Sequence, residues 1–490
     1  MSTPASLGRN LAITASLLAL AACTTVGPNY QVPGSAKVNA PAAQGAFIES
    51  ATPAVSQAPV PEGWWKLYGD PVLNGLVEEA LVANTDLRIA AANLARAHAV
   101  SAEADDAGGF SVGASAAAMR ARESGEQYLL TEPLPVENLA DVGVKVSYQV
   151  DLVGRIMRAS EAAHADAETS QAALDLARVS VAADVARAYV EACSSGHELA
   201  VAQRTVDLQS RGLEVTGKLV AAGRGASLDV TRAKAQLDLS RAALPTFESR
   251  RRAALYRLAT LTGKTPAEFP RAVEACVAPP RLSQPLPVGD GAALLKRRPD
   301  VRAAERGLAG ATARIGVATA ALYPSVSFGL GAGSTGLLAD IGTAPTNRWG
   351  LSSLISWTLP GEGEHARIRA TEAGADAALA RFDGTVLNAL RETETSLAVY
   401  AHELDRNVAL RSARDEAATA EGQAQRLYRA GKSPYLTGLD AQRTLATAEA
   451  ALATSDGALA ADQVNLFLAL GGGWENAPPP TTVVAVGAAR

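Results

Sequence analysis

The sequence predicts a membrane α+β protein in which four short strands per chain close into a barrel with those of other copies, and long helices continue from it. Three observations predict this fold. Segments of about ten residues alternate between apolar and polar side chains, as transmembrane strands do. Alanine-rich segments of about sixty residues are typical of unbroken helix. The order of these elements occurs twice along the chain.

The chain begins with an export signal. An arginine precedes an apolar stretch from Leu11 to Ala22, which is too short to span a bilayer and ends on small residues before Cys23. This pattern predicts a signal peptide and a bacterial lipobox, in which Cys23 receives diacylglycerol and a further acyl group such as palmitate. Thr24 after the cysteine is typical of a lipoprotein addressed to the outer membrane.

Composition argues against a nucleic-acid partner. The 490 residues include 45 basic and 50 acidic side chains, so the net charge is -5. No run of Lys and Arg is longer than that at Arg250, Arg251 and Arg252, which stand in a predicted helix. Aromatic residues make up only 4% of the chain, which suits closely packed long helices better than a bulky globular core.

The two cysteines of the mature chain, besides Cys23, are Cys193 and Cys276. The first stands in a predicted helix and the second in a proline-rich connector. Spacing alone does not decide whether they pair, so buried free thiols are the default expectation.

An internal repeat follows a leader rich in Pro, Ala and Ser. Residues 219–237 superpose on 427–445 at an offset of 208, and residues 86–94 match 300–308 at an offset of 214. We therefore expect two halves of similar design. The expected division is a signal peptide over 1–22, a lipidated extended segment over 23–62, a first repeat over 63–275, a second repeat over 276–473 and a tail over 474–490.

Each half contains the same elements in the same order: a helix, two strands and two long helices. Helices are expected at about 86–107, 154–222 and 227–262 in the first half, and at 300–321, 362–430 and 433–470 in the second. Strands are expected near 110–121, 141–152, 325–334 and 348–359.

The strand near 141–152 shows the alternation most clearly. Val142, Val144 and Val146 fall on one face, while Lys145 and Ser147 fall on the other. A soluble hairpin has the same pattern, so one segment alone is a weak signal. Four such segments on an exported, lipidated chain favour apolar faces turned to lipid and polar faces turned to a lumen.

The helical turns have a local explanation. In "AGKSP", Gly431 can adopt the left-handed position that ends a helix, while Ser433 is expected to cap the next helix and Pro434 to occupy its first position. Gly223 and Ser227 are expected to act in the same way. The two shorter helices of the first half, if laid end to end, would match one long helix in length. A plain coiled-coil rod would explain the helices but not the strands.

Backbone hydrogen bonding constrains the number of copies. An open sheet in lipid leaves two unsatisfied edges, each group costing several kcal/mol, so the sheet must close. The smallest known barrels have about eight strands, more than one chain supplies. An eight-stranded interior is filled by side chains, whereas three copies of four strands give twelve and leave room for a channel.

Seven segments spread over nearly the whole chain resemble the outer-membrane efflux proteins of the TolC type, and within them the lipidated OprM- and NodT-like members of RND efflux systems. The matching segments are "CTTVGPNYQVP" (23–33), "WWKLYGDPVLNGLVEEAL" (64–81), "YQVDLVGR" (148–155), "LLKRRPDVRAAE" (294–305), "ALYPSVSF" (321–328), "YLTGLDAQRTL" (435–445) and "NLFLALGGGW" (465–474).

The resemblance implies a homotrimeric passive conduit for drugs or other small molecules. A twelve-stranded barrel in the outer membrane would continue into a long α-helical barrel in the periplasm, with a mixed collar built from the termini and residues near 264–297. Its implied partners are outer-membrane lipid, a periplasmic adaptor (membrane fusion) protein and an inner-membrane transporter of the RND type.

Site residues carried by the resemblance belong to three groups. A periplasmic gate is implied, where Asp and Arg three apart on a helix can pair with each other or with a neighbouring subunit. Helical tips are implied as the adaptor-docking surface, and aromatic residues are expected at the membrane interfaces. The gate residues are Leu436, Asp440 and Arg443; the tip residues are Gly223, Arg224, Ser227, Gly431, Lys432 and Ser433; the interface aromatics are Tyr148, Trp349 and Trp357.

Catalytic and metal motifs are weak. The glycines at 331, 333 and 336 fit GxGxxG, but no helix is expected directly after them, and His402-Glu403 lacks the second histidine of HExxH. We expect no enzyme activity, no metal and no cofactor beyond the covalent lipid. The alternatives are a structural periplasmic lipoprotein without a pore, an outer-membrane conduit for protein or peptide secretion, and an exported hydrolase.

Overall fold

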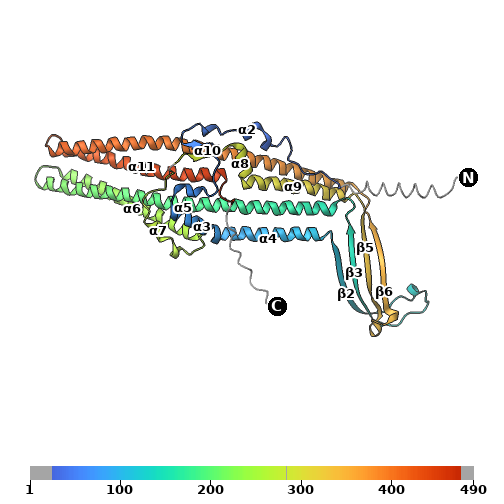
Figure 1. Ribbon diagram of the computed structural model, residues 1–490. Coiled ribbons are helices and arrows are strands. Elements are labelled where there is room, and N and C mark those ends of the chain that lie inside the picture. The colour runs from blue at the N-terminus through green and yellow to red at the C-terminus, as the bar shows by residue number, and fades with distance from the viewer. Residues whose placement is uncertain (1–24, 283, 476–490) are drawn as a thin grey trace. The chain divides into compact units, whose positions relative to one another are not determined.

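The computed structural model describes residues 25–282 and 284–475 (Figure 1). Cys23, the expected signal peptide and most of the expected C-terminal tail lie outside the described residues. The chain divides into two compact units, each assembled from three segments. The sheet unit contains residues up to 33, 95–169 and 304–382, and the helical unit contains 34–94, 170–303 and the residues from 383 onward.

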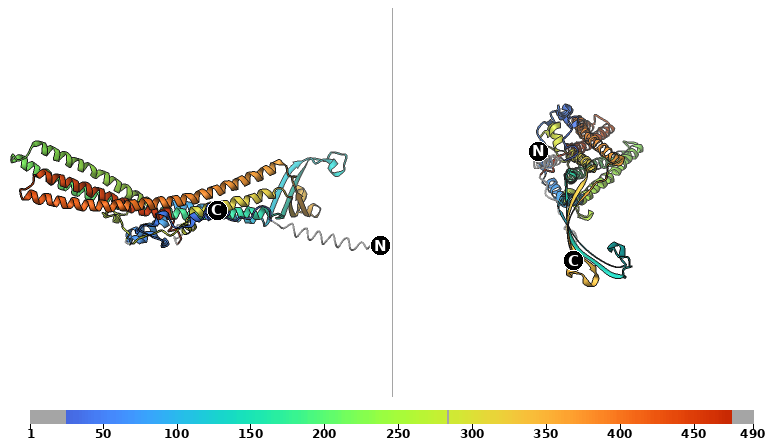
Figure 2. Two further views of the ribbon diagram at one scale, coloured as in Figure 1. Left: turned by 90° about the horizontal axis from the view of Figure 1, so that it is seen from above. Right: turned by 90° about the vertical axis from the view of Figure 1, so that its right-hand side faces the viewer.

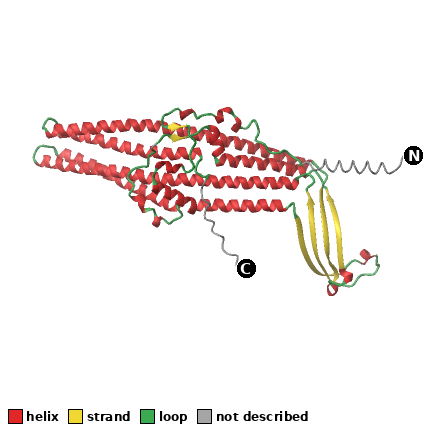
Figure 3. Ribbon diagram, in the orientation of Figure 1, coloured by secondary structure: helices red, strands yellow, loops and turns green. Residues whose placement is uncertain are grey.

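The sheet unit contains one antiparallel sheet of four strands in the order β2-β3-β5-β6. The four strands lie side by side in Figure 3, and Figure 2 shows the same sheet from two further directions. Their bounds are β2 Phe110–Ala121, β3 Glu137–Val150, β5 Ser325–Leu337 and β6 Asn347–Ser356.

Three strand ends differ from the expected ones by three residues or more. β5 ends at Leu337, beyond the expected residue 334, because its pairing with β3 continues to Leu139. β3 begins at Glu137, before the expected residue 141, because pairing with β2 continues to Ala121 opposite Glu137. β6 ends at Ser356, before the expected residue 359, because Ser325 is the last residue of β5 that faces it. The pairing partner, and not the alternation alone, determines where each strand ends.

Four helices have residues in both units, and the remaining elements lie in the helical unit or in the strand loops. The four are α4 Thr85–Asp106, α5 Arg155–Ala221, α9 Pro299–Ala320 and α10 Glu362–Arg429. The other helices are α2 Pro41–Gln44, α3 Pro71–Ala83, α6 Ser227–Leu261, α7 Arg271–Glu274, α8 Gly291–Arg297 and α11 Tyr435–Leu470, and two short strands are β1 Val55–Ser56 and β4 Leu286–Pro287. The 3-10 turns are Lys37–Asn39, Ile48–Ser50, Trp64–Tyr68, Gly125–Tyr128, Pro266–Glu268, Leu338–Asp340 and Ala344–Thr346.

None of the helices within 25–282 and 284–475 combines the length and the apolar character that crossing a membrane requires.

The core of the helical unit is aromatic where the leader meets the long helices. Trp64 is fully buried and stacks on Phe467 of α11, with ring centroids 4.6 Å apart. Leu73 of α3 and Leu258 of α6 join the same buried cluster. β1 pairs in parallel with β4, so the leader and residues 264–297 form a small mixed layer, as a collar built from these segments requires.

Both helical turns contain the same backbone hydrogen bonds. Gly223 and Gly431 have φ values of 71° and 70°, the left-handed conformation expected of them. The amide of Arg224 donates to the carbonyl of Leu219 at 2.8 Å, and that of Lys432 donates to Leu427 at 2.9 Å. Each of these pairs is separated by the offset of 208, which supports the proposed repeat.

The expected serine caps are wrong. α6 begins at Ser227 itself, so Ala226 is the cap residue, and the carboxylate of Asp229 accepts from the amide of Ala226 at 3.3 Å. α11 begins at Tyr435, because Pro434 is extended with ψ of 152° and therefore precedes the helix. No side-chain hydrogen bond caps α11, and the hydroxyl of Ser433 lies outside it.

Cys193 and Cys276 form a disulfide, so the expectation of free thiols is wrong. They are 83 positions apart in the sequence, yet their Cα atoms are 4.9 Å apart. Gly196 of α5 permits this approach, since a Cβ atom there would lie 2.3 Å from the carbonyl oxygen of Cys276. The bond ties the connector after α7 to the buried face of α5.

We expect reduction of this disulfide to lower the free energy of unfolding by about 2–5 kcal/mol, because the unfolded chain regains the freedom of a large loop. Thermal unfolding followed by circular dichroism, with and without reductant, measures the change. A Cys276→Ser variant is the control, since reductant should not alter its midpoint. Native protein in which both thiols react with a thiol reagent would contradict the pairing.

Candidate functional site

The four strands present one apolar face in register. Val146 of β3 lies opposite Val112 of β2 and Leu330 of β5, and Leu330 lies opposite Leu351 of β6. The neighbouring rows repeat the pattern, each row crossing all four strands. These rows are Phe110, Tyr148, Phe328 and Ser353, and Ala114, Val144, Ala332 and Trp349.

These apolar side chains are open to the surroundings. Trp349 is 82% exposed and Leu351 76% exposed. Exposed apolar side chains over four adjacent strands form a contiguous patch that water solvates poorly. The apolar face expected from the sequence is therefore one surface of this sheet.

The opposite face is polar and glycine-rich. Ser147 lies opposite Ser111, and their hydroxyl oxygens are 2.6 Å apart. Across β5, the guanidinium of Arg348 donates to both carboxylate oxygens of Asp141 at 2.8 Å. The arginine also donates to the hydroxyl of Thr335 at 2.6 Å, which links three strands on this face.

The sheet has two unpaired edges. Within the described residues, β2 pairs only with β3 and β6 pairs only with β5. Every residue of β6 is exposed, as is nearly every residue of β2. The outward backbone groups of these two strands are therefore available to strands of other chains.

Of the three interface aromatics expected from the sequence, Tyr148 and Trp349 belong to the apolar face of the sheet. Tyr148 packs on Phe110 with ring centroids 5.0 Å apart, near the helix end of the sheet. Trp357 follows β6 at the same end, and its indole nitrogen donates to the carbonyl of Leu322 at 3.1 Å. Trp349 stands near the start of β6, eight residues before Trp357, roughly 26 Å along an extended strand.

The expected gate residues line a groove in the helical unit. The groove has a volume of about 550 Å³ and lies among α5, α6, α10 and α11. Leu436 is 58% exposed at its rim. Charged side chains from both halves of the chain line it: Asp229, Arg232, Glu421, Asp440, Arg443 and Glu449.

Asp440 and Arg443 do not latch to each other. Both side chains are exposed, and across residues 25–282 and 284–475 no ion pair joins them. The repeat places Arg232 where the second half has Asp440, so the charge in this groove is asymmetric.

The expected docking residues lie at the exposed ends of two helical hairpins. Gly223, Arg224 and Ser227 are exposed at the α5–α6 turn, and Gly431 and Lys432 at the α10–α11 turn. Ser433 of the second turn is half-buried. The hydroxyl of Tyr435 donates to the carbonyl of Gly212 at 3.0 Å, which ties one hairpin to the other close to these turns.

A contact that local sequence does not reveal joins the start of α4 to the end of α6. The side chain of Asn84 accepts from the amide of Asp86 at the start of α4 and donates to the carbonyl of Leu261 at the end of α6, at 2.8 and 3.0 Å. One asparagine thus caps both helix ends. The structure confirms that the two helices meet end to end.

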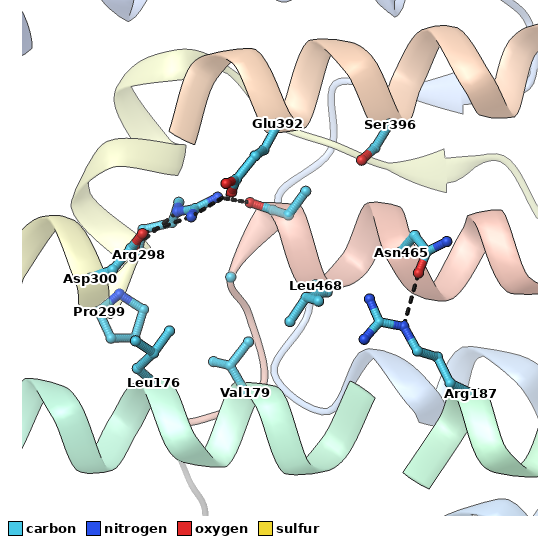
Figure 4. Close-up of a pocket in the computed structure, with 12 residues that line it drawn as sticks. Leu176, Val179, Arg187, Arg298, Pro299, Asp300, Glu392, Ser396, Asn465 and Leu468 are labelled. Carbon is cyan, nitrogen blue, oxygen red and sulfur yellow. Dashed lines mark hydrogen bonds and ion pairs between the residues drawn. The ribbon is translucent and has the colours of Figure 1, made fainter. Parts of the chain in front are cut away.

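Arg298 occupies the corresponding position in the second half, 214 residues after Asn84. Its guanidinium donates to the carbonyl of Ala469 at the end of α11 at 2.8 Å, and to Asp300 and Glu392 at 2.7 and 2.9 Å (Figure 4). Burial opposes the charged form, but the two carboxylates dominate and raise the pKa of Arg298. The charge also suits the negative end of the α11 dipole.

A pocket of about 320 Å³ opens beside this junction (Figure 4). Arg187 and Asn465 face Arg298 across it, and Arg187 donates to Asn465 at 2.9 Å. The guanidinium groups of Arg187 and Arg298 both have partners, so the geometry is that of a helix junction. Arg298 stands in the segment "KRRPD", but its contact with the distant Ala469 is visible only in the structure.

Two observations bear on the metal and dinucleotide motifs weighed from the sequence. No group of three or more metal-ligating side chains occurs among the residues the structure describes. Gly331 and Gly333 of the GxGxxG pattern lie within β5, in the sheet. The pattern therefore does not form a loop at a helix N-terminus.

Comparisons with known proteins agree on one family. The sequence profile named Outer membrane efflux protein matches residues 76–264 and 292–472. Nodulation protein T of Rhizobium leguminosarum bv. trifolii is 28% identical over 93% of this chain and 96% of its own. The toluene efflux pump outer membrane protein TtgC of Pseudomonas putida is 29% identical over 95% of both chains.

Solved structures show the same fold. The outer-membrane channel OprN is 34% identical, with a TM-score of 0.85 over 92% of this chain and 99% of its own. The open state of the MtrE outer membrane channel of Neisseria gonorrhoeae is 26% identical, with a TM-score of 0.80 over 92% of this chain and 98% of its own.

We expect Arg298→Ala to destabilise the protein by about 2–4 kcal/mol, because it leaves two carboxylates and a helix end without their common donor. Chemical unfolding followed by circular dichroism measures the loss. Arg391→Ala is the matched control, since Arg391 is 65% exposed and lies 3.8 Å from Glu392. An equal loss in both variants would mean that the junction adds no particular stability.

Proposed function

This chain belongs to the outer membrane efflux protein family, and on that premise we propose that three copies share one closed barrel that conducts solutes out of the cell. The protein is the outer-membrane channel of an efflux system. It is a passive conduit, and the driving force for export comes from a pump in the inner membrane.

The observation that carries the proposal is the set of rows across the sheet. Apolar side chains of all four strands share one face and polar side chains share the other. Hydrocarbon solvates the first face and water the second, which is the arrangement of a membrane channel wall. The unpaired β2 of one copy and β6 of the next remove each other's free edge when they pair.

Three copies of this four-stranded sheet supply twelve strands. A barrel of that size leaves an open lumen, whereas one of about eight strands is filled by its own side chains. Glycines and serines of β5, together with Lys145 and Arg348, would line the lumen. Such a wall offers few specific contacts, which suits a conduit whose selectivity resides in the pump.

The membrane boundary follows from the aromatic residues. Trp357 at the helix end of β6 and Trp349 near its other end fit the two aromatic belts of a transmembrane barrel, and Tyr148 lies between them, in the row of Ser353. A lipid on Cys23 would add a second attachment to the outer membrane.

The helical tips are the natural place for a partner. Arg224 and Lys432 present positive charge at exposed turns whose backbone is held by the same hydrogen bonds in both hairpins. The family relationship implies a periplasmic adaptor there and, through it, an inner-membrane transporter, for which the RND type is the proposed class. We propose no enzymatic activity and no cofactor besides the lipid.

We propose that Leu436, Asp440 and Arg443 restrict the periplasmic entrance. The two charged side chains have no ion pair with each other and face the groove of the helical unit. In this proposal a neighbouring copy supplies the opposite charge in the closed state, in competition with Arg232 and Asp229 of the same groove. Because such pairs are exposed, each contributes only about 0.2–1 kcal/mol, which suits a gate that has to open.

We expect the purified protein to run as a trimer and to conduct ions across a planar lipid bilayer. The closed barrel predicts discrete current steps, and mass spectrometry of the detergent-solubilised protein counts the subunits. A rod without a pore predicts no current at any voltage. Zero current from intact trimers of both the natural protein and the gate variants would overturn the channel.

We expect the double variant Asp440→Ala, Arg443→Ala to raise the open population about three- to a hundredfold, since three exposed pairs are lost together. Single-channel recording measures the change. Asp238→Ala, Arg241→Ala is the matched control, because that pair has the same spacing on α6 and lies in the open at 3.6 Å. An unchanged current in the Asp440→Ala, Arg443→Ala variant would contradict the proposed gate.

A further inference from the structure

The segment that follows the expected lipid attachment site lies in a seat built by buried groups of the sheet unit. Arg158 of α5 is 1% exposed, and its guanidinium is directed at this segment. It donates to the carbonyls of Val26 and Gly27 at 3.1 and 3.2 Å, and to the side chain of Asn29 at 2.7 Å. Its remaining partner is Glu161, at 2.7 Å.

Glycines at the contact make the seat close-fitting. A Cβ atom on Gly27 would lie 2.4 Å from the Cα atom of Gly316, and one on Gly154 would lie 2.4 Å from the side chain of Thr25. Gly27 and Gly154 also have φ values of 83° and 78°, which favour glycine. The backbone of the segment therefore touches α9 and the start of α5 directly.

Two further contacts extend the seat in both directions. The amide of Val26 donates to the carbonyl of Val153, three residues after β3 ends at Val150, at 3.0 Å. The hydroxyl of Tyr30 donates to Glu305 at 3.2 Å, and Arg306 lies 5.6 Å from the centre of its ring. Residues 25–30 are thus held from the end of β3 to α9.

We propose that this seat positions the acylated end of the chain beside the β3–β5 part of the sheet, and that Arg158 is its positioning residue. The proposal rests on the lipid attachment at Cys23 put forward above. Cys23 is two positions before Thr25, and two positions of chain span at most about 7 Å, so holding Thr25 in place confines the lipid. A free linker would let the acyl chains sample the whole membrane around the barrel.

The physical advantage is a common insertion point. The acyl chains and the apolar face of the sheet both favour hydrocarbon. With a fixed spacing between them, insertion of one into the membrane raises the effective concentration of the other at the membrane. The seat makes the lipid part of the wall of the barrel, whereas a flexible tether would only retain the protein.

The test uses the full-length protein purified from cells grown with a fatty acid that carries a photoreactive group near its carboxyl end. After illumination, mass spectrometry maps the peptides bound to the acyl chain. The expected result is cross-linking concentrated in residues 146–153 and 322–330, and at least a fivefold loss in Arg158→Ala. Asn29→Ala removes one hydrogen bond between Arg158 and the segment without changing α5, and it should also reduce the cross-linking.

Arg155→Ala is the control, because Arg155 is exposed one turn before Arg158 on the same helix. It should leave both the cross-links and the yield of trimer unchanged. The same cross-link pattern in Arg158→Ala and Asn29→Ala as in the natural protein would overturn the seat. Absence of any fatty acid on the protein would remove the lipid attachment itself and the seat's role with it, an outcome distinct from an attached but unpositioned chain.

Discussion

The constraint on which the rest of the structure depends is the pair of unpaired edges of the four-stranded sheet. An apolar face as exposed as that of Trp349 and Leu351 requires hydrocarbon, and hydrocarbon satisfies no backbone hydrogen bonds. The edges therefore have to meet strands of other copies. Closure of the sheet into a shared barrel follows from this requirement. The proposed number of three copies needs a second argument, because an eight-stranded barrel is filled by its own side chains whereas twelve strands leave a lumen.

A second constraint is the length of the long helices, which each half of the chain matches by setting two shorter helices end to end. The first half joins them through the neutral side chain of Asn84, and the second through the charged side chain of Arg298. Both solutions give the carbonyls at a helix end a donor. The charged version also recruits Glu392 of α10, so the two halves are equal in architecture but not in electrostatics.

The same asymmetry continues to the groove near the helical turns, where Arg232 of one half corresponds to Asp440 of the other. The helices and strands that both halves share would form the walls of the conduit. Charged residues such as Asp440, whose counterpart in the first half is Arg232, are present in one half only. The seat of residues 25–30 is a further departure, because this segment precedes the first repeat and contacts α5 and α9. Structure common to both halves forms the fold, whereas the proposed gate and the proposed lipid positioning depend on groups that are present once.

The sequence by itself determined the features that neighbouring residues encode. The alternation of Val144 and Lys145 predicted the two faces of the sheet, and Gly223 and Gly431 predicted the helical turns, because strand and helix periodicities are local. Only the tertiary structure decided the disulfide of Cys193 with Cys276, the capping of α11 by Arg298 and the seat around Arg158. Each joins residues at least 83 positions apart, and such contacts depend on the path of the chain rather than on local pattern.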